Sequence, residues 1–354
     1  MNPLFHWFVT GALPFVVLLG LLIFVHESGH FALAKLSRMR VDEFSLGFGP
    51  PLFRVVRNGT GYAIRMIPLG GFVKIAGMDP NEDPDTPGGF NTKPLSARFM
   101  TLLAGCFMNF ALAVALFCVV GMIYGVPRTT TRLDAVEPGS PAASAGIRQG
   151  DVITAIGGEP VPTVEAIRAA IEKAGTHPIR VTFRRGQQTI TAIVTPKHME
   201  PGQTVRIGVA FAPHMVRVGP GVALKDGLVS TIAWADEIGS GLVKMVTGHV
   251  PASDIGGPVA IARATAQQAR RGMADFLRFG GIISIDLAII NLVPFPGLDG
   301  ARLAFLLVEL VRRRKLDPRK EAYVHAVGIA ILFALLAAIT GKDISQWIHD
   351  LGAR

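Results

Sequence analysis

The stretch FVHESGHFALAKL, residues 24–36, lies at the end of an apolar run and contains two histidines and a glutamate before its first lysine. On a helix, His26 and His30 lie one turn apart on the same face, and Glu27 follows the first histidine directly. Two imidazoles at this spacing can bind one zinc ion, and a glutamate beside them can act as general base. The HExxH pattern therefore predicts a metal site within the first helix.

The surroundings of this pattern strengthen the prediction. An acid in the middle of a membrane-spanning helix costs at least ~2.5 kcal/mol, so ionisable groups there usually face a polar cavity or take part in chemistry. Histidines that hydrogen-bond across a helix interface are the purely structural alternative. That alternative does not account for a glutamate next to two histidines at ligand spacing.

Composition indicates a membrane protein. The chain has 354 residues, of which 50% are hydrophobic and 17% charged, and its mean hydropathy is +0.42. The net charge of +9 does not come from a basic stripe with interleaved aromatic residues, so we expect no nucleic-acid partner. Cys106 and Cys118 lie within one apolar stretch at a spacing that favours neither a disulfide nor a metal site.

Four apolar stretches approach the length of about 20 residues that crosses a bilayer. They run from about Leu13 to Leu36, Phe99 to Tyr124, Phe279 to Val311 and Ala322 to Thr340. The first has no basic residue before Lys35 and is too long for a signal peptide, so we expect it to be retained as a span.

Basic residues predict the orientation of these spans. Lys35, Arg38 and Arg40 follow the first span, and a second basic cluster at 312–320 separates the third from the fourth. Because connections rich in Lys and Arg stay in the cytoplasm, both termini are expected outside, and the site around His26 toward the cytoplasmic side of a lipid bilayer.

The insert between the second and third spans, at about 127–275, is polar. Its first part predicts strands, a helix from about Val164 to Ala174, and two further strands joined at Gly186. With GSPAASAGIRQGD and ITAIGGEPV, it resembles a circularly permuted bacterial PDZ domain. A PDZ fold binds an extended peptide at a sheet edge, and the strand RIGVAF, around Ile207, Gly208 and Val209, is the candidate edge. A spacer outside the membrane is the alternative.

The third span supplies a candidate for the third zinc ligand. Pro294, Pro296 and Gly297 must interrupt any helix, and broken backbone at membrane depth is tolerated only where it is buried in protein or lines a watered cavity. Asp299 follows the break directly. It is expected to bind the metal, although a cap of the helix that begins near Ala301 is the other interpretation.

Taken together, these motifs resemble the site-2 protease family of intramembrane zinc metalloproteases, peptidase M50 type, in the bacterial form related to the regulator of sigma-E protease with one PDZ domain. The resemblance rests on HESGH, FSLGFGP, IPLGGFVKIAGM, AGCFMNFALA, GGPVAIA and NLVPFPGLDG. It implies that His26, His30 and Asp299 bind one Zn²⁺, that Glu27 is the general base, and that Asn291 holds the substrate or the transition state.

The same resemblance implies partners and a location. The expected substrates are single-pass transmembrane proteins, often anti-sigma factors or remnant signal peptides, usually after a site-1 protease has made a first cut. The expected location is the bacterial inner membrane, with the PDZ domain extracytoplasmic.

The sequence departs from the family pattern at three places. Asp286 stands where many members have an asparagine five residues before the Asn291 position, so a substrate contact there would need a protonated acid or a different geometry. Ala301 and Arg302 replace a Gly-His pair.

The third departure lies in the second span. Gly105 is followed by Cys106 instead of proline, which predicts a straighter second span. Asn109, also in that span, is equally well interpreted as an interhelical hydrogen-bonding residue or a functional one.

A transmembrane substrate must be unwound before cleavage, because its amides are already hydrogen-bonded within a helix. The stretch YAIRMIPLGGFVKIAGM predicts a β-hairpin or a bent strand around Gly70 and Gly71. Such a strand could pair with the unwound substrate, whereas an ordinary surface hairpin is the alternative. The stretch 222–246 predicts an amphipathic helix on the outer membrane surface, or a plain linker helix.

The expected fold is a polytopic α-helical membrane protein with about four transmembrane helices, a membrane-associated β-hairpin and one inserted α+β PDZ domain. The expected segments are 1–36, 37–98 with the hairpin, 99–124, 125–213 as the PDZ domain, 214–278, 279–315 and 316–354. A membrane scaffold would have no use for Glu27 beside paired histidines. A zinc transporter would be expected to repeat its spans internally, and no such repeat is found.

Overall fold

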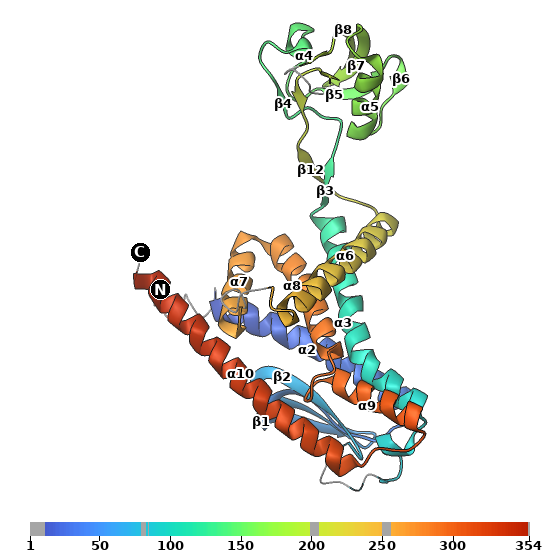
Figure 1. The fold of residues 1–354 in the computed structure, drawn as a ribbon, viewed down its shortest axis with the longest axis vertical. Coiled ribbons are helices and arrows are strands. Elements are labelled where there is room, and N and C mark those ends of the chain that lie inside the picture. The colour runs from blue at the N-terminus through green and yellow to red at the C-terminus, as the bar shows by residue number, and fades with distance from the viewer. Residues whose placement is uncertain (1–10, 79–82, 84, 199–204, 250–255, 353–354) are drawn as a thin grey trace. The chain divides into compact units, whose positions relative to one another are not determined.

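The computed structural model describes residues 11–78, 83, 85–198, 205–249 and 256–352. The chain forms two compact units (Figure 1). Unit 1 comprises Met1–Val120 and Gly219–Arg354, and unit 2 comprises Gly121–Val218. The HExxH pattern and Asp299 belong to unit 1, whereas the polar insert forms unit 2.

Helix α2, Leu13–Leu36, has the bounds predicted for the first span. A proline in its first turn fits there because the first helical N–H groups have no intrahelical partner. The helix ends at Ser37, and Arg38 adopts a left-handed conformation with φ 53°. The HExxH pattern therefore lies in the second half of a continuous helix.

Strands β1, Val41–Arg57, and β2, Thr60–Ile75, form a long antiparallel hairpin that packs against α2. Its turn lies at Asn58 and Gly59, so the stretch around Gly70 is a bent strand and not a hairpin of its own. Gly47 and Gly70 adopt positive φ where the register of the pairing shifts. The bend brings the end of β2 alongside the HExxH turn.

Helix α3, Leu95–Ile123, is continuous and begins four residues before the predicted second span. It crosses α2 closely at Gly29, where an added β-carbon would collide with the backbone carbonyl of Ala104. Small residues allow this approach, which places α3 directly against the histidine face of α2.

Unit 1 also contains the helices α6, Pro220–Val246; α7, Pro258–Arg271; α8, Met273–Leu292; α9, Asp299–Arg312; and α10, Pro318–Gly352. The predicted helix at 222–246 and the predicted break after Leu292 are both confirmed. The separate helix α7 was not predicted.

Three helices of the described residues are long and apolar enough to cross a membrane. They span Leu13–Leu36, Leu95–Ile123 and Lys320–Ser345. The interrupted span made by α8 and α9 is not among them, and Asp275, Arg278 and Asp286 lower the hydropathy of α8. The count of four spans therefore stays a prediction.

Unit 2 has a four-stranded sheet in the order β6-β5-β7-β8 and one longer helix, α5. Its main elements are β5, Val152–Ile156; β6, Glu159–Pro160; α5, Val164–Ala174; β7, Ile179–Arg185; and β8, Gln188–Val194. The predicted helix bounds and the two strands around Gly186 are confirmed. Phe183, Ile153 and Ile167 are almost fully buried and form its core.

The prediction of a single strand at RIGVAF, residues 206–211, is wrong. This stretch is divided into β10, Val205–Arg206, and β11, Val209–Ala210, because Gly208 adopts φ 76° between them. Strand β11 pairs with β4, Ala135–Val136, and Ile207 turns into the core with 2% of its surface exposed.

Candidate metal centre

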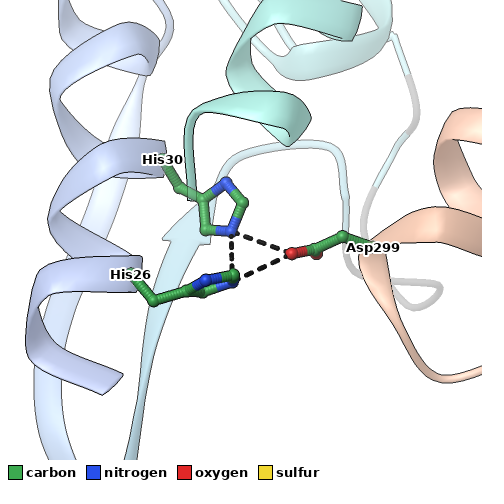
Figure 2. Close-up of side chains that lie close together, drawn as sticks. All are labelled: His26, His30 and Asp299. Atoms are coloured by element: carbon green, nitrogen blue, oxygen red, sulfur yellow. Dashed lines mark hydrogen bonds and ion pairs between the residues drawn. The ribbon is translucent and has the colours of Figure 1, made fainter. Parts of the chain in front are cut away.

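His26, His30 and Asp299 lie together, although 269 residues separate His30 from Asp299 (Figure 2). Both histidines project from α2, and Asp299 projects from the first turn of α9 toward them. Oδ2 of Asp299 is 3.0 Å from Nε2 of His26 and 3.1 Å from Nε2 of His30. The two Nε2 atoms are 3.1 Å apart.

This donor set fits zinc. Zinc takes imidazole nitrogen and carboxylate oxygen at about 2.0–2.1 Å in tetrahedral geometry, which puts neighbouring donor atoms about 3.3 Å apart. The three observed separations are 3.0–3.1 Å. Three protein donors also leave one tetrahedral position open, as catalytic zinc sites do.

His30 has the tautomer that metal binding requires. Its Nδ1 lies 2.8 Å from the backbone carbonyl of Thr101 on α3, to which it donates. The lone pair is then on Nε2, which faces His26 and Asp299. The side chain of His30 is buried, so this orientation is held by packing as well.

Asp299 does not cap α9. It is the first residue of that helix, and the N-cap position before it is occupied by Leu298, whose side chain makes no capping hydrogen bond. The conformation is set by the preceding loop, where Gly297 adopts φ 105° and donates its N–H to Nδ1 of His325 on α10. The capping interpretation of Asp299 is therefore wrong, and its carboxylate is turned to the two histidines.

Glu27 is half-buried beside strand β2. The backbone of Val73 lies near its carboxylate, and a β-carbon on Gly71 would lie 3.6 Å from its Cγ. Gly71 is therefore beside the predicted base. Gly70 has φ 127° and packs against the ring of Phe48, so it bends the strand without touching the site.

The other predicted residues lie apart from this cluster. Asp286 and Asn291 are half-buried on α8, and the side chain of neither forms a hydrogen bond or ion pair with another of the described residues. Ile207, Gly208 and Val209 belong to unit 2, where they line a groove together with α5.

Two further residues shape the site and were not predicted to do so. Gly105 on α3 faces both Nε2 atoms so closely that a β-carbon there would lie 2.7 Å from that of His26. His325 is buried and holds the loop before Asp299. A histidine inside an apolar span was a usable signal for His325. A glycine in an apolar helix carries no comparable signal.

A known protein family matches most of the chain. The model of peptidase family M50 matches residues 14–335, which include the HExxH pattern and Asp299. The chain belongs to peptidase family M50.

Curated relatives of this M50 protease are named as zinc metalloproteases. The zinc metalloprotease RasP of Geobacillus kaustophilus is 31% identical over 96% of this chain and 99% of its own length. A putative zinc metalloprotease of Clostridium perfringens is 34% identical over 91% of this chain and 95% of its own. The regulator of sigma-W protease RasP of Bacillus subtilis is 29% identical over 96% of this chain and 99% of its own length. The M50 protease is therefore a zinc metalloprotease of the membrane.

Among solved structures, the PDZ domain of an SdrC-like protein from Listeria monocytogenes matches a part of the chain. It covers 24% of this chain and 90% of its own at 20% identity, with a TM-score of 0.22. This score is too low to bear on the fold of unit 2.

Proposed function

We propose that this protease hydrolyses peptide bonds within the transmembrane segments of single-pass membrane proteins. The observation that carries the proposal is the position of the donor cluster, because two of its three donors, His26 and His30, lie on an apolar helix long enough to cross a bilayer. A hydrolytic site at that depth can reach a substrate segment that is itself in the membrane. The name of the Bacillus subtilis relative, a regulator of sigma-W protease, makes anti-sigma factors a reasonable substrate class.

His26, His30 and Asp299 are the proposed ligands of one zinc ion. Zinc bound there would supply a Lewis acid that acidifies water and polarises a peptide carbonyl. Glu27 then takes a proton from the attacking water and returns it to the leaving amine. The strand residues Gly71 and Val73 lie beside this carboxylate and limit its position next to the histidines.

The substrate must lose its helical hydrogen bonds before its carbonyl is accessible. Strand β2 passes the predicted base at Gly71, so an unwound segment that pairs with it there would replace those bonds. Gly70 contributes the bend in the strand. Asn291 and Asp286 on α8 are the proposed polar contacts to the substrate.

Unit 2 is proposed to be a PDZ domain that binds an extended peptide. Ile207, Gly208 and Val209 form one side of its groove, and Ile167 and Ile171 of α5 line the same groove. A peptide left by a preceding site-1 protease is the proposed occupant. The groove would then select substrates that have already been trimmed.

The proposed topology has four spans in a bacterial inner membrane, the third being the broken α8–α9 segment and the fourth lying in α10. Basic residues at 35–40 and 312–320 favour cytoplasmic connections at those places. Both termini and unit 2 are then extracytoplasmic, and the metal centre is near the cytoplasmic side.

The deciding experiment compares purified, detergent-solubilised wild type with Glu27→Gln on a trimmed and an untrimmed single-pass substrate. We expect wild type alone to cleave, with about one zinc per chain in both proteins. Glu237→Gln, a change of the same kind at an exposed position on α6, is the matched control and should cleave normally. Cleavage by Glu27→Gln at the wild-type rate would refute the role of the base.

A further inference from the structure

Asn109 lies at the point where α3 passes the metal centre. Its side chain is fully buried, with Nδ2 at 3.3 Å from Nδ1 of His26. Its Oδ1 is buried and has no hydrogen-bond partner in the described part of the chain. A buried amide oxygen without a donor is costly, by about 1–3 kcal/mol, so its presence calls for a reason.

To bind a metal, both histidines of the cluster must carry the ring proton on Nδ1 and leave the lone pair on Nε2. His30 has this tautomer, because its Nδ1 donates to the carbonyl of Thr101 and leaves the lone pair on Nε2. His26 needs an acceptor at its own Nδ1 for the same purpose. The side chain of Asn109 lies within hydrogen-bonding distance of this atom.

The orientation of the amide decides which nitrogen of His26 carries the proton. If Nδ2 of Asn109 donates to Nδ1, the proton of a neutral imidazole is on Nε2, which faces His30 and Asp299 and could then not bind a metal. A half-turn about the Cβ–Cγ bond exchanges the amide oxygen and nitrogen with little change in shape. Oδ1 then accepts from Nδ1–H, and the lone pair of His26 is on Nε2.

We infer that Asn109 is a positioning residue that holds His26 in its metal-binding tautomer through an Nδ1–H to Oδ1 hydrogen bond. The inference rests on the proposed role of His26 as a zinc ligand. Partners of this kind typically contribute 10–100-fold to metal affinity. Asn109 thus does for His26 what the main chain of Thr101 does for His30.

The hydrogen bond of Asn109 with α8 is made by its backbone and not by its side chain. Asn109 also joins α3 to α8, but through its backbone carbonyl, which accepts a 2.8 Å hydrogen bond from Oγ of Ser284. Ser284 is fully buried as well. The side chain of Asn109 and the hydroxyl of Ser284 are therefore two polar groups at one helix crossing, and only the first touches a histidine.

The test measures zinc affinity of the full-length protein in detergent by competition with a chelating dye. The variants are Asn109→Leu, which has similar size but no acceptor, Asn109→Asp, which keeps one, and Ser284→Ala, which removes the neighbouring interhelical bond. We expect Asn109→Leu to bind zinc 10–100-fold more weakly. Asn109→Asp and Ser284→Ala should stay within about threefold of wild type, because both keep an acceptor for His26.

A spectroscopic measurement accompanies the affinities. With Co²⁺ in place of zinc, the visible absorption bands report the ligand field, and they should shift in Asn109→Leu and remain in Ser284→Ala. Thermal unfolding of the metal-free proteins shows whether each variant is folded.

Two results would overturn the inference. One is wild-type zinc affinity in Asn109→Leu. The other is an equal loss of zinc affinity in Asn109→Leu and Asn109→Asp when both variants are folded. His26→Ala separates this failure from failure of the proposed metal site. Wild-type zinc affinity in His26→Ala would show that the site itself is misassigned.

Discussion

Gly105 on α3 lies against His30 on α2 so closely that a β-carbon on the glycine would overlap the imidazole at Nε2. The same β-carbon would lie 2.7 Å from Nε2 of His26. The absence of a side chain at this position therefore leaves the space in which the donor atoms of the metal centre meet. The requirement is steric and does not depend on the backbone conformation, since Gly105 is within a regular helix.

Gly105→Ala is expected to abolish stoichiometric zinc binding and cleavage, because the methyl group occupies the space between the donor atoms. Zinc content after purification and cleavage of a single-pass substrate measure the two losses. Gly20→Ala on α2 is the matched control, because its β-carbon would meet only an ordinary contact at 3.8 Å. Full zinc content in Gly105→Ala would contradict the geometry of the site.

Removal of the His325 side chain is expected to loosen the loop that carries Asp299. Nδ1 of His325 accepts the N–H of Gly297 at 2.9 Å, and a β-carbon on Gly328 would collide with Pro296, so α10 presses directly on this loop. An N–H left without an acceptor costs about 1–3 kcal/mol. His325→Leu should therefore lower both the unfolding temperature and the zinc affinity.

His325→Asn is the control for that experiment, because its side-chain oxygen can take the place of Nδ1. We expect it to retain most of the zinc affinity that His325→Leu loses. Equal affinities in the two variants would mean that the hydrogen bond to Gly297 does not position Asp299.

The first helix and its metal-binding face could be predicted from the sequence. The long apolar run that ends at Lys35 predicts a helix with the bounds that the structure has. The four-residue spacing of His26 and His30 predicts that both lie on one face of that helix. The break after Leu292 was equally predictable, because prolines interrupt a helix whatever surrounds them.

The other parts depend on contacts that a sequence does not display. Asp299 looks the same as a cap or as a ligand until α9 is placed against α2. The strand at RIGVAF is divided because Gly208 takes a left-handed conformation, which glycine permits but does not require. Helix α7 was missed because its apolar residues alternate with arginines and glutamines, as in a polar linker.

Asp343 on α10 is expected to stabilise the start of α7. Its carboxylate is buried and accepts from the N–H groups of Gly257 at 3.1 Å and Ala260 at 3.0 Å, so it satisfies two donors at the helix N-terminus. Loss of such a cap costs ~1 kcal/mol. Asp343→Ala should raise hydrogen exchange in the first turn of α7 about fivefold, as that energy implies.

Asp343→Asn keeps an acceptor but loses the charge that favours a helix N-terminus, so its exchange should be intermediate. Exchange in α5 of unit 2 provides an internal reference and should not change. Wild-type exchange rates in α7 of Asp343→Ala would show that the helix start is held by packing alone.

Unit 2 is expected to lose stability in acid through Asp151. Burial raises the pKa of this carboxyl, but hydrogen bonds from Arg185 and from the N–H of Arg148 outweigh burial and lower the pKa below its ordinary value of 3.8. A lowered pKa in the folded state means that the unfolded chain binds the proton more tightly. The stabilisation is therefore complete well above pH 3.8 and is lost as the pH falls below it.

Hydrogen exchange of β5 and β7 in wild type and Asp151→Asn tests this at matched pH values. At pH 6 the variant should exchange faster, because its neutral amide replaces a carboxylate that accepts from Nε and Nη2 of Arg185, both at 2.8 Å. The difference should shrink as the pH falls toward 3, since protonation removes the charge from wild type but leaves the variant unchanged. A difference that is constant from pH 6 to pH 3 would mean that the charge of Asp151 contributes nothing and only its shape matters.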